Sequence, residues 1–131
     1  MNTKPRVGFY GLTGCAGCLL SVIFNEEELL DFADNMDIVA FRLIKDDNDD
    51  QGPLDIAFIE GTIVTNDDKA MALHLRKRAK TIIALGACAH VGNIPSIRHV
   101  ADERHLDTLK YYKNQQNDDV PEGPVPLHKV I

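Results

Sequence analysis

Four short apolar segments alternate with longer segments of helical character, and this alternation limits the possible fold more than any other feature of the chain. The apolar segments cover residues 6–12, 38–43, 55–61 and 81–85. They are rich in β-branched and aromatic residues with little polar alternation, which is typical of buried strands in parallel sheets. The sequence therefore predicts an α/β fold, with a mainly parallel sheet and helices on both faces.

The segments between and after these strands predict the helices, which are expected over residues 18–33, 66–79 and 96–112. The first is rich in Leu and Glu, and its pattern indicates a break near Asn25. The second is expected to begin at a cap formed by Asn66 or Asp67 and to continue to Ala79. The acidic segment DDNDD, residues 46–50, is interpreted as a solvated loop because it lacks the Gly and Glu of a calcium loop.

Length and charge set further limits. A chain of 131 residues is expected to form one domain over residues 1–131. Its formal net charge of -6 argues against nucleic-acid binding, which needs a clustered basic surface. Apolar runs fall short of the roughly 18 residues of a membrane span, and the first residues do not resemble a signal peptide. The chain is therefore expected to act in the cytoplasm without direct membrane insertion.

Three cysteines and one glutamate fall where predicted strands end. Cys15 and Cys18 follow the first strand, Glu60 ends the third, and Cys88 follows the fourth. The carboxyl ends of parallel strands meet at one edge of the sheet, where open α/β folds bind their ligands. We therefore expect three thiols and one carboxylate to share that edge.

The residues alone leave several kinds of thiol chemistry open. In a reducing compartment, metal binding or redox chemistry is favoured over structural disulfides. Cys15 and Cys18 could cycle as a disulfide, although Cys88 would then have no role. The three cysteines and His90 could form a zinc site. An iron-sulfur cluster suits thiolates from separate loops, but a 4Fe-4S cubane has four corners and the chain has three cysteines.

The glycines around the cysteine pair form a loop of the pattern GxxGxxG, at Gly11, Gly14 and Gly17. This spacing differs from that of dinucleotide-binding loops and of Walker-type phosphate loops. Small residues instead allow a loop to wrap closely around a bound group. Backbone N–H groups near Gly14 could then donate to the sulfur atoms of a cluster.

Three motifs, in order along the chain, carry a family resemblance: GFYGLTGCAGCLLS, FIEGTIVTNDD and ALGACAHVGNIPSI. With these motifs the chain resembles the small subunit of cytoplasmic nickel-iron hydrogenases, especially the delta subunit of sulfhydrogenases and the gamma subunit of deazaflavin-linked hydrogenases. It also resembles the 20 kDa subunit of respiratory complex I. The resemblance runs over nearly the whole chain and implies a flavodoxin-like fold.

The resemblance implies an electron-transfer subunit that carries a 4Fe-4S cluster next to the catalytic large subunit. The matching residues are Cys15, Cys18 and Cys88 for the cluster ligands, and Glu60, Gly61 and Thr62 for the loop beside the cluster. The implied partners are a nickel-iron hydrogenase-type large subunit and other iron-sulfur or flavin electron-transfer subunits. The chain itself would be non-catalytic, because the nickel-binding cysteine pairs of the large subunit are not in it.

The chain departs from the family pattern at the fourth cluster ligand. In the family this cysteine lies in a PGCP motif after a final strand. Residues 1–131 contain no PGCP motif, and we expect the final strand to be absent from them as well. The cluster would then be completed by a non-cysteine ligand or another chain, or the chain would be a shortened form. Two other functions stay open as alternatives: a CxxC dithiol oxidoreductase and a cluster-free structural subunit.

Overall fold

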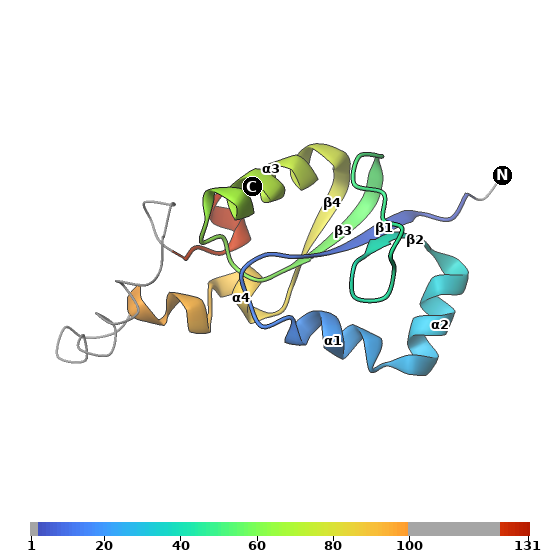
Figure 1. The fold of residues 1–131 in the computed structure, drawn as a ribbon, viewed down its shortest axis with the longest axis horizontal. Coiled ribbons are helices and arrows are strands. Elements are labelled where there is room, and N and C mark those ends of the chain that lie inside the picture. The colour runs from blue at the N-terminus through green and yellow to red at the C-terminus, as the bar shows by residue number, and fades with distance from the viewer. Residues whose placement is uncertain (1–2, 100–123) are drawn as a thin grey trace.

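Four parallel strands form the sheet at the centre of the molecule (Figure 1). The computed structural model describes residues 3–99 and 124–131. The strands are β1 (Arg6–Gly11), β2 (Asp37–Phe41), β3 (Leu54–Glu60) and β4 (Ala79–Leu85). They are hydrogen-bonded in the order β2-β1-β3-β4, and every neighbouring pair is parallel. Each strand lies within two residues of its predicted segment, which confirms the predicted parallel α/β fold.

Helices cover both faces of the sheet, as predicted (Figure 1). α1 (Gly17–Ile23) and α2 (Glu26–Asn35) lie on one face, and α3 (Asn66–Arg78) lies on the other. The two helices α1 and α2 come from the single Leu- and Glu-rich segment. The segment breaks at Asn25, which precedes the first residue of α2, so the predicted break is confirmed.

Three short helical segments complete the described part of the chain. α4 (Ala87–Val91) and a 3-10 helix (Ile94–His99) follow β4, and a second 3-10 helix (Leu127–Lys129) lies beside α4. The helix predicted over residues 96–112 is thus a 3-10 helix where the structure describes it. Its remainder lies outside the described residues.

Aromatic side chains from three strands form the core beneath α1 and α2. In the register of the sheet, Phe9 on β1 lies opposite Phe41 on β2 and Phe58 on β3. The ring centroid of Phe9 lies 4.5 Å from that of Phe41 and 4.8 Å from that of Phe58, in stacked geometry. Phe32 on α2 packs against Phe9 with a centroid distance of 6.0 Å. Burial of these rings holds α2 against the sheet.

α3 packs on the opposite face through Ala72 and Leu75, which are fully buried. The prediction that Asn66 or Asp67 caps this helix is wrong. The cap is Thr65, whose hydroxyl accepts the N–H of Asp68, while the Asp68 carboxylate accepts the N–H of Thr65. Asp at this position forms the reciprocal pair of a capping box, where Glu or Gln is more usual.

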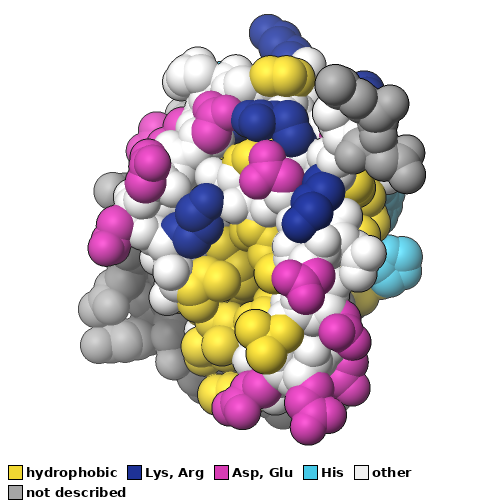
Figure 2. All heavy atoms as spheres, turned by 90° about the vertical axis from the view of Figure 1, so that its right-hand side faces the viewer, with side chains coloured by type: hydrophobic (Ala, Val, Ile, Leu, Met, Phe, Trp, Pro, Cys, Tyr) yellow, Lys and Arg dark blue, Asp and Glu magenta, His cyan; other side chains and the backbone are white. Residues whose placement is uncertain are grey.

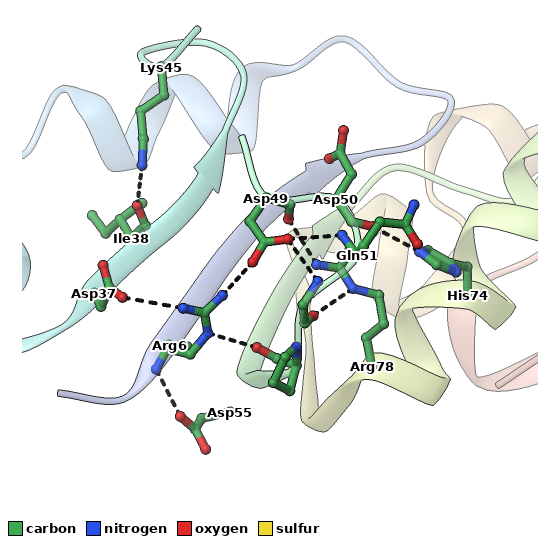
Figure 3. Close-up of polar contacts among 12 residues, drawn as sticks. Arg6, Asp37, Ile38, Lys45, Asp49, Asp50, Gln51, Asp55, His74 and Arg78 are labelled. Carbon is green, nitrogen blue, oxygen red and sulfur yellow. Dashed lines mark hydrogen bonds and ion pairs between the residues drawn. The ribbon is translucent and has the colours of Figure 1, made fainter. Parts of the chain in front are cut away.

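Residues 42–53 cross from β2 to β3 without a helix, and polar contacts hold this crossover in place (Figure 3). The Asp49 carboxylate accepts hydrogen bonds from the backbone N–H groups of Gln51 and Gly52. It also pairs with the Arg6 guanidinium at the start of β1. Asp49 therefore closes the turn and attaches it to the sheet.

Arg78, at the end of α3, holds the same crossover from the other side (Figure 3). Its guanidinium donates to the backbone carbonyls of Asp49 and Gly52. The interpretation of DDNDD as a solvated loop is thus right for Asp46 and Asp47, which are exposed, and wrong for Asp49. The turn folds back on the sheet because two arginines from distant elements reach it.

α1 and α2 cover their face of the sheet incompletely. Figure 2 shows hydrophobic side chains gathered in a hollow on one side of the molecule. A groove of about 210 Å³ lies between α2 and the sheet, and its lining includes Phe9, Leu29 and Phe58. Ile83 on β4 lies opposite Phe58 in the register and is exposed. None of the helices in residues 3–99 and 124–131 is long and apolar enough to cross a membrane.

Replacing Leu75 by Ala tests the packing of α3. We expect Leu75→Ala to lower the free energy of unfolding by about 2–5 kcal/mol, because the side chain is fully buried and leaves a cavity. Leu73 lies on the same helix with 39% of its surface exposed, so Leu73→Ala should cost less than about 1 kcal/mol. Urea denaturation of both variants measures the difference. Equal losses would contradict the packing of α3 described above.

The acidic crossover predicts a pH dependence of stability. Hydrogen bonds from Gly52 and Gln51, and the nearby Arg6, lower the pKa of Asp49 below its ordinary value of 3.8. The ionised carboxylate therefore stabilises the fold above about pH 4, and this stabilisation is lost as the pH falls through the lowered pKa. We expect Asp49→Asn to lower the melting temperature by a few degrees at pH 7, with a smaller effect below pH 4.

The control for this prediction is Asp46→Asn. Asp46 is an exposed carboxylate of the same loop, and its side chain has no partner among the described residues. Thermal melts of both variants between pH 3 and pH 8 should separate them. A melting temperature of Asp49→Asn that matches wild type across this range would contradict the role of Asp49 in the crossover.

Candidate functional site

All three cysteines lie at the carboxyl edge of the sheet, where the sequence predicts them. Cys15 is exposed in the loop after β1, and Cys18 is half-buried in the first turn of α1. Cys88 is half-buried in the first turn of α4, directly after β4. All three are free thiols. The parallel sheet brings them together because β1 and β4 end at the same edge.

The cysteine loop is joined to the turn after β3 by backbone hydrogen bonds. Thr13 and Thr62 form an antiparallel bridge, with N···O distances of 3.2 Å and 2.8 Å. The Leu12 N–H donates to the Glu60 carbonyl at 2.9 Å. Residues 60–62, the predicted loop beside the cluster, therefore lie directly against the loop that carries Cys15.

Gly61 is required at this junction for two reasons. Its φ of +85° lies in the left-handed region that side chains disfavour. A Cβ atom there would also lie 2.8 Å from the carbonyl oxygen of Thr13. Gly14 approaches from the other loop, and a Cβ at Gly14 would lie 3.3 Å from the Cα of Gly61. The two glycines allow the backbones of the two loops to touch.

The Glu60 carboxylate holds the first turn of α1. Glu60 is 4% exposed, and its Oε2 accepts the backbone N–H of Leu19 at 2.9 Å. The residue before α1, Ala16, has no side-chain cap, so this carboxylate from β3 satisfies a donor that the helix start leaves open. Glu60 therefore positions the helix turn in which Cys18 lies.

Cys18 has the most perturbed environment of the three thiols. Burial raises the pKa of the Cys18 thiol, and the neighbouring Glu60, Cys88 and Cys15 raise it further. A Cβ atom at Gly86 would lie 2.2 Å from the Cys18 sulfur, so only glycine fits beneath it. Burial and the neighbouring acidic groups thus disfavour the Cys18 thiolate, and a bound cation would offset this effect.

The other two sulfur atoms have weak neighbouring donors. The backbone N–H of Gly17 lies 3.4 Å from the Cys15 sulfur, and the Asn93 amide nitrogen lies 3.9 Å from the Cys88 sulfur. Nitrogen donors beside sulfur are a feature of iron-sulfur sites, where they tune the potential. The Gly17 N–H and the Asn93 amide are therefore placed to donate hydrogen bonds to sulfur atoms at this edge of the sheet.

Within residues 3–99 and 124–131, no three His, Cys, Asp or Glu side chains converge to hold a single metal ion. The Cys3His zinc alternative requires such a tetrahedron around one ion, and the described side chains do not form it. A cubane differs, because each thiolate binds a different iron atom at its own corner. Soft thiolates are the ligands that such a cluster takes, so the chemistry of the three cysteines suits it.

The sequence did not reveal three positions on which the site depends. Thr13 bridges to Thr62, and its hydroxyl donates to Asp68 at 2.7 Å, which joins the cysteine loop to the start of α3. Gly86 fits beneath Cys18, and its place between a strand and a cysteine was a signal available in the sequence. The sequence holds no signal for the role of the Leu19 N–H, because a backbone N–H group does not depend on the type of side chain.

Comparison with known proteins identifies the family of the chain. Residues 15–127 match the family described as "NADH ubiquinone oxidoreductase, 20 Kd subunit". The chain belongs to this family. The family match covers the cysteine pair, the turn after β3 and the first turn of α4, where Cys88 lies. It confirms the relationship to the 20 kDa subunit that the three sequence motifs indicate.

Curated relatives of this family member are named as hydrogenase subunits. The chain is 34% identical to a subunit of the F420-non-reducing hydrogenase of Methanothermobacter marburgensis, over 99% of this chain and 42% of the relative. It is 30% identical to the delta subunit of sulfhydrogenase 2 of Pyrococcus furiosus, over 70% of this chain and 38% of the relative. The chain therefore spans less than half the length of these relatives.

A solved structure shares the fold. It is titled "Crystal structure of NAD+-reducing [NiFe]-hydrogenase in the H2-reduced state", and the chain matches it with a TM-score of 0.74 and 26% identity. The match covers 98% of this chain and 78% of that chain. The predicted resemblance to small subunits of nickel-iron hydrogenases is confirmed.

Gly61→Ala tests the junction between the two loops. We expect this variant to lose at least about 1 kcal/mol of stability, because the backbone conformation and the Thr13 carbonyl both oppose a Cβ atom. Gly11→Ala is the matched control, since a Cβ at Gly11 would meet its nearest neighbour at 3.6 Å. Chemical denaturation of both variants gives the comparison. A Gly61→Ala protein as stable as the control would contradict this account of the junction.

Proposed function

We propose that this chain carries a 4Fe-4S cluster on the thiolates of Cys15, Cys18 and Cys88, and that it serves as an electron-transfer subunit of a nickel-iron hydrogenase-type complex. The gathering of all three cysteines, as free thiols, at the carboxyl edge of the sheet carries the proposal. When bound, such a cluster supplies one-electron transfer. The chain contributes no catalytic residue of its own in this proposal.

The residues around the thiols have defined tasks in this proposal. Glu60 keeps the first turn of α1 in place through Leu19, and so keeps Cys18 at the edge. The Gly14 and Gly61 contact keeps the cysteine loop close to the turn after β3. Thr62 holds the same junction through its backbone bridge to Thr13. These contacts fix the spacing of the ligands before any metal binds.

The names of the relatives support the proposed partners. They are hydrogenase subunits, so we propose a nickel-iron hydrogenase-type large subunit as the neighbour of this edge, with other iron-sulfur or flavin subunits as further carriers. The exposed position of Cys15 is consistent with an edge that a partner covers. Cys15, Cys18 and Cys88 supply three of the four corners in this proposal, and the proposal assigns no ligand to the fourth corner.

The dithiol alternative is less well supported. A reactive cysteine at a helix start has a lowered pKa, which makes the thiolate available. The Cys18 thiol has a raised pKa instead, because of its burial and of the nearby Glu60, Cys88 and Cys15. A bound cation would offset this effect, because positive charge close to the sulfur favours the thiolate. We further propose that residues 1–131 form one domain, that the protein acts in the cytoplasm and that its role in the complex is non-catalytic.

Iron and sulfide analysis after anaerobic purification tests the proposed cluster. We expect a brown protein with iron and acid-labile sulfide in equal amounts, and Cys88→Ser should lose more than roughly half of both, since one thiolate ligand is removed. His90→Ala is the control, because His90 is an exposed neighbour of Cys88 on α4. Visible absorption should follow the metal content in every sample.

Two outcomes would contradict the proposed cluster. One is a colourless wild-type protein without acid-labile sulfide, even after reconstitution with iron and sulfide. The other is a Cys88→Ser protein with the full wild-type content of iron. An iron-free protein with a Cys15–Cys18 disulfide that reductant opens would instead support the dithiol alternative.

A further inference from the structure

A pocket of about 260 Å³ lies beside the cysteine loop, at the carboxyl end of β1. Its walls are largely apolar or glycine, and they include Gly14, Leu19 and Met71. Two charged side chains, Glu60 and Arg42, also line it. In open α/β sheets this edge is where ligands enter, so a pocket here is a candidate binding site.

The Glu60 carboxylate in this pocket has unused hydrogen-bonding capacity. Glu60 is 4% exposed, and its Oε2 accepts the Leu19 N–H. Among residues 3–99 and 124–131, no cation pairs with Glu60 and no donor reaches its Oε1. A carboxylate can accept about four hydrogen bonds. The pocket therefore presents an acceptor with unused capacity at Oε1.

The basic residue in the lining does not fill this role. Arg42 pairs with Asp50 in the crossover, and its side chain is 69% exposed. Its guanidinium is thus held by another carboxylate on the surface, and the pocket stays open beside it. A donor to Glu60 Oε1 would therefore come from outside the described residues.

We propose that this pocket receives an arginine side chain of the partner subunit that docks on the cysteine edge, and that its guanidinium pairs with Glu60. The apolar walls suit the methylene stem of arginine, and the buried carboxylate suits its forked donors. The net charge of -6 favours a basic contact on the partner. This inference rests on the proposed function for its partner, whereas the pocket and its carboxylate do not depend on the cluster.

The test uses the full chain and two probes: n-butylguanidinium, and the blocked tripeptide acetyl-Ala-Arg-Ala-amide. Binding is followed by NMR at the backbone amides of Leu19 and Gly14, next to the pocket. We expect saturable shifts with both probes. Glu60→Gln should weaken binding about tenfold or more, because the amide keeps an oxygen for Leu19 but loses the charge. Glu27→Gln, at an exposed site on α2, should bind as wild type does.

The outcomes separate the possible occupants. No saturable shift in wild type, or equal affinity in Glu60→Gln, overturns the site. Binding of n-butylguanidinium without binding of the tripeptide overturns an arginine that is presented by a protein. Tetramethylammonium lacks N–H donors, so equal binding of this ion overturns recognition of a guanidinium through hydrogen bonds to the carboxylate.

A cluster-free variant separates this inference from the proposed function. The variant combines Cys15→Ser, Cys18→Ser and Cys88→Ser, and a thermal melt first establishes that it is folded. Binding of the tripeptide to this variant supports the pocket even where the iron analysis fails. Loss of tripeptide binding in Glu60→Gln at normal iron content supports both the arginine pocket and the proposed cluster. A normal iron content without any tripeptide binding overturns the pocket and leaves the cluster proposal intact.

Discussion

The hydrogen bond from the Leu19 N–H to the buried Glu60 carboxylate connects the parts on which the site depends. It joins the last residue of β3 to the first turn of α1, 41 positions apart in the sequence. α1 has no side-chain cap of its own, so its start is set by a strand and not by its local sequence. The same carboxylate raises the pKa of Cys18, after the larger effect of burial. One buried acid thus acts on helix position and on thiol chemistry together.

The parallel sheet makes this connection possible. β1 and β3 are neighbours in register, with Gly11 opposite Glu60, so the loops that follow them begin side by side. The bridge between Thr13 and Thr62 extends this pairing beyond the strands, and Gly61 permits it by its left-handed backbone. On the face that α1 and α2 cover, the stacked rings of Phe9, Phe41 and Phe58 join β1 to its neighbours β2 and β3. The site is therefore a continuation of the sheet.

Much of the fold could be predicted because hydrophobic patterns are local. The strands around Phe9 and Phe58 lie within two residues of their predicted segments, and the break at Asn25 is where the pattern indicates it. The cap of α3 was less predictable, since Thr65 lies next to three other residues that can cap a helix. The structure of DDNDD was not predictable, because Arg6 and Arg78 reach Asp49 from distant elements.

The sequence by itself determined the kind of fold, its family and the identity of the thiols and the acid at the edge. These follow from residue type and spacing, which a local pattern or an ordered set of motifs records. Only the tertiary structure decided how Glu60 is used, that Gly86 lies beneath Cys18, and that a pocket opens beside the cysteine loop. These features depend on distances between segments far apart in the chain. They are set by the packing of backbones and side chains, which no single segment of the sequence contains.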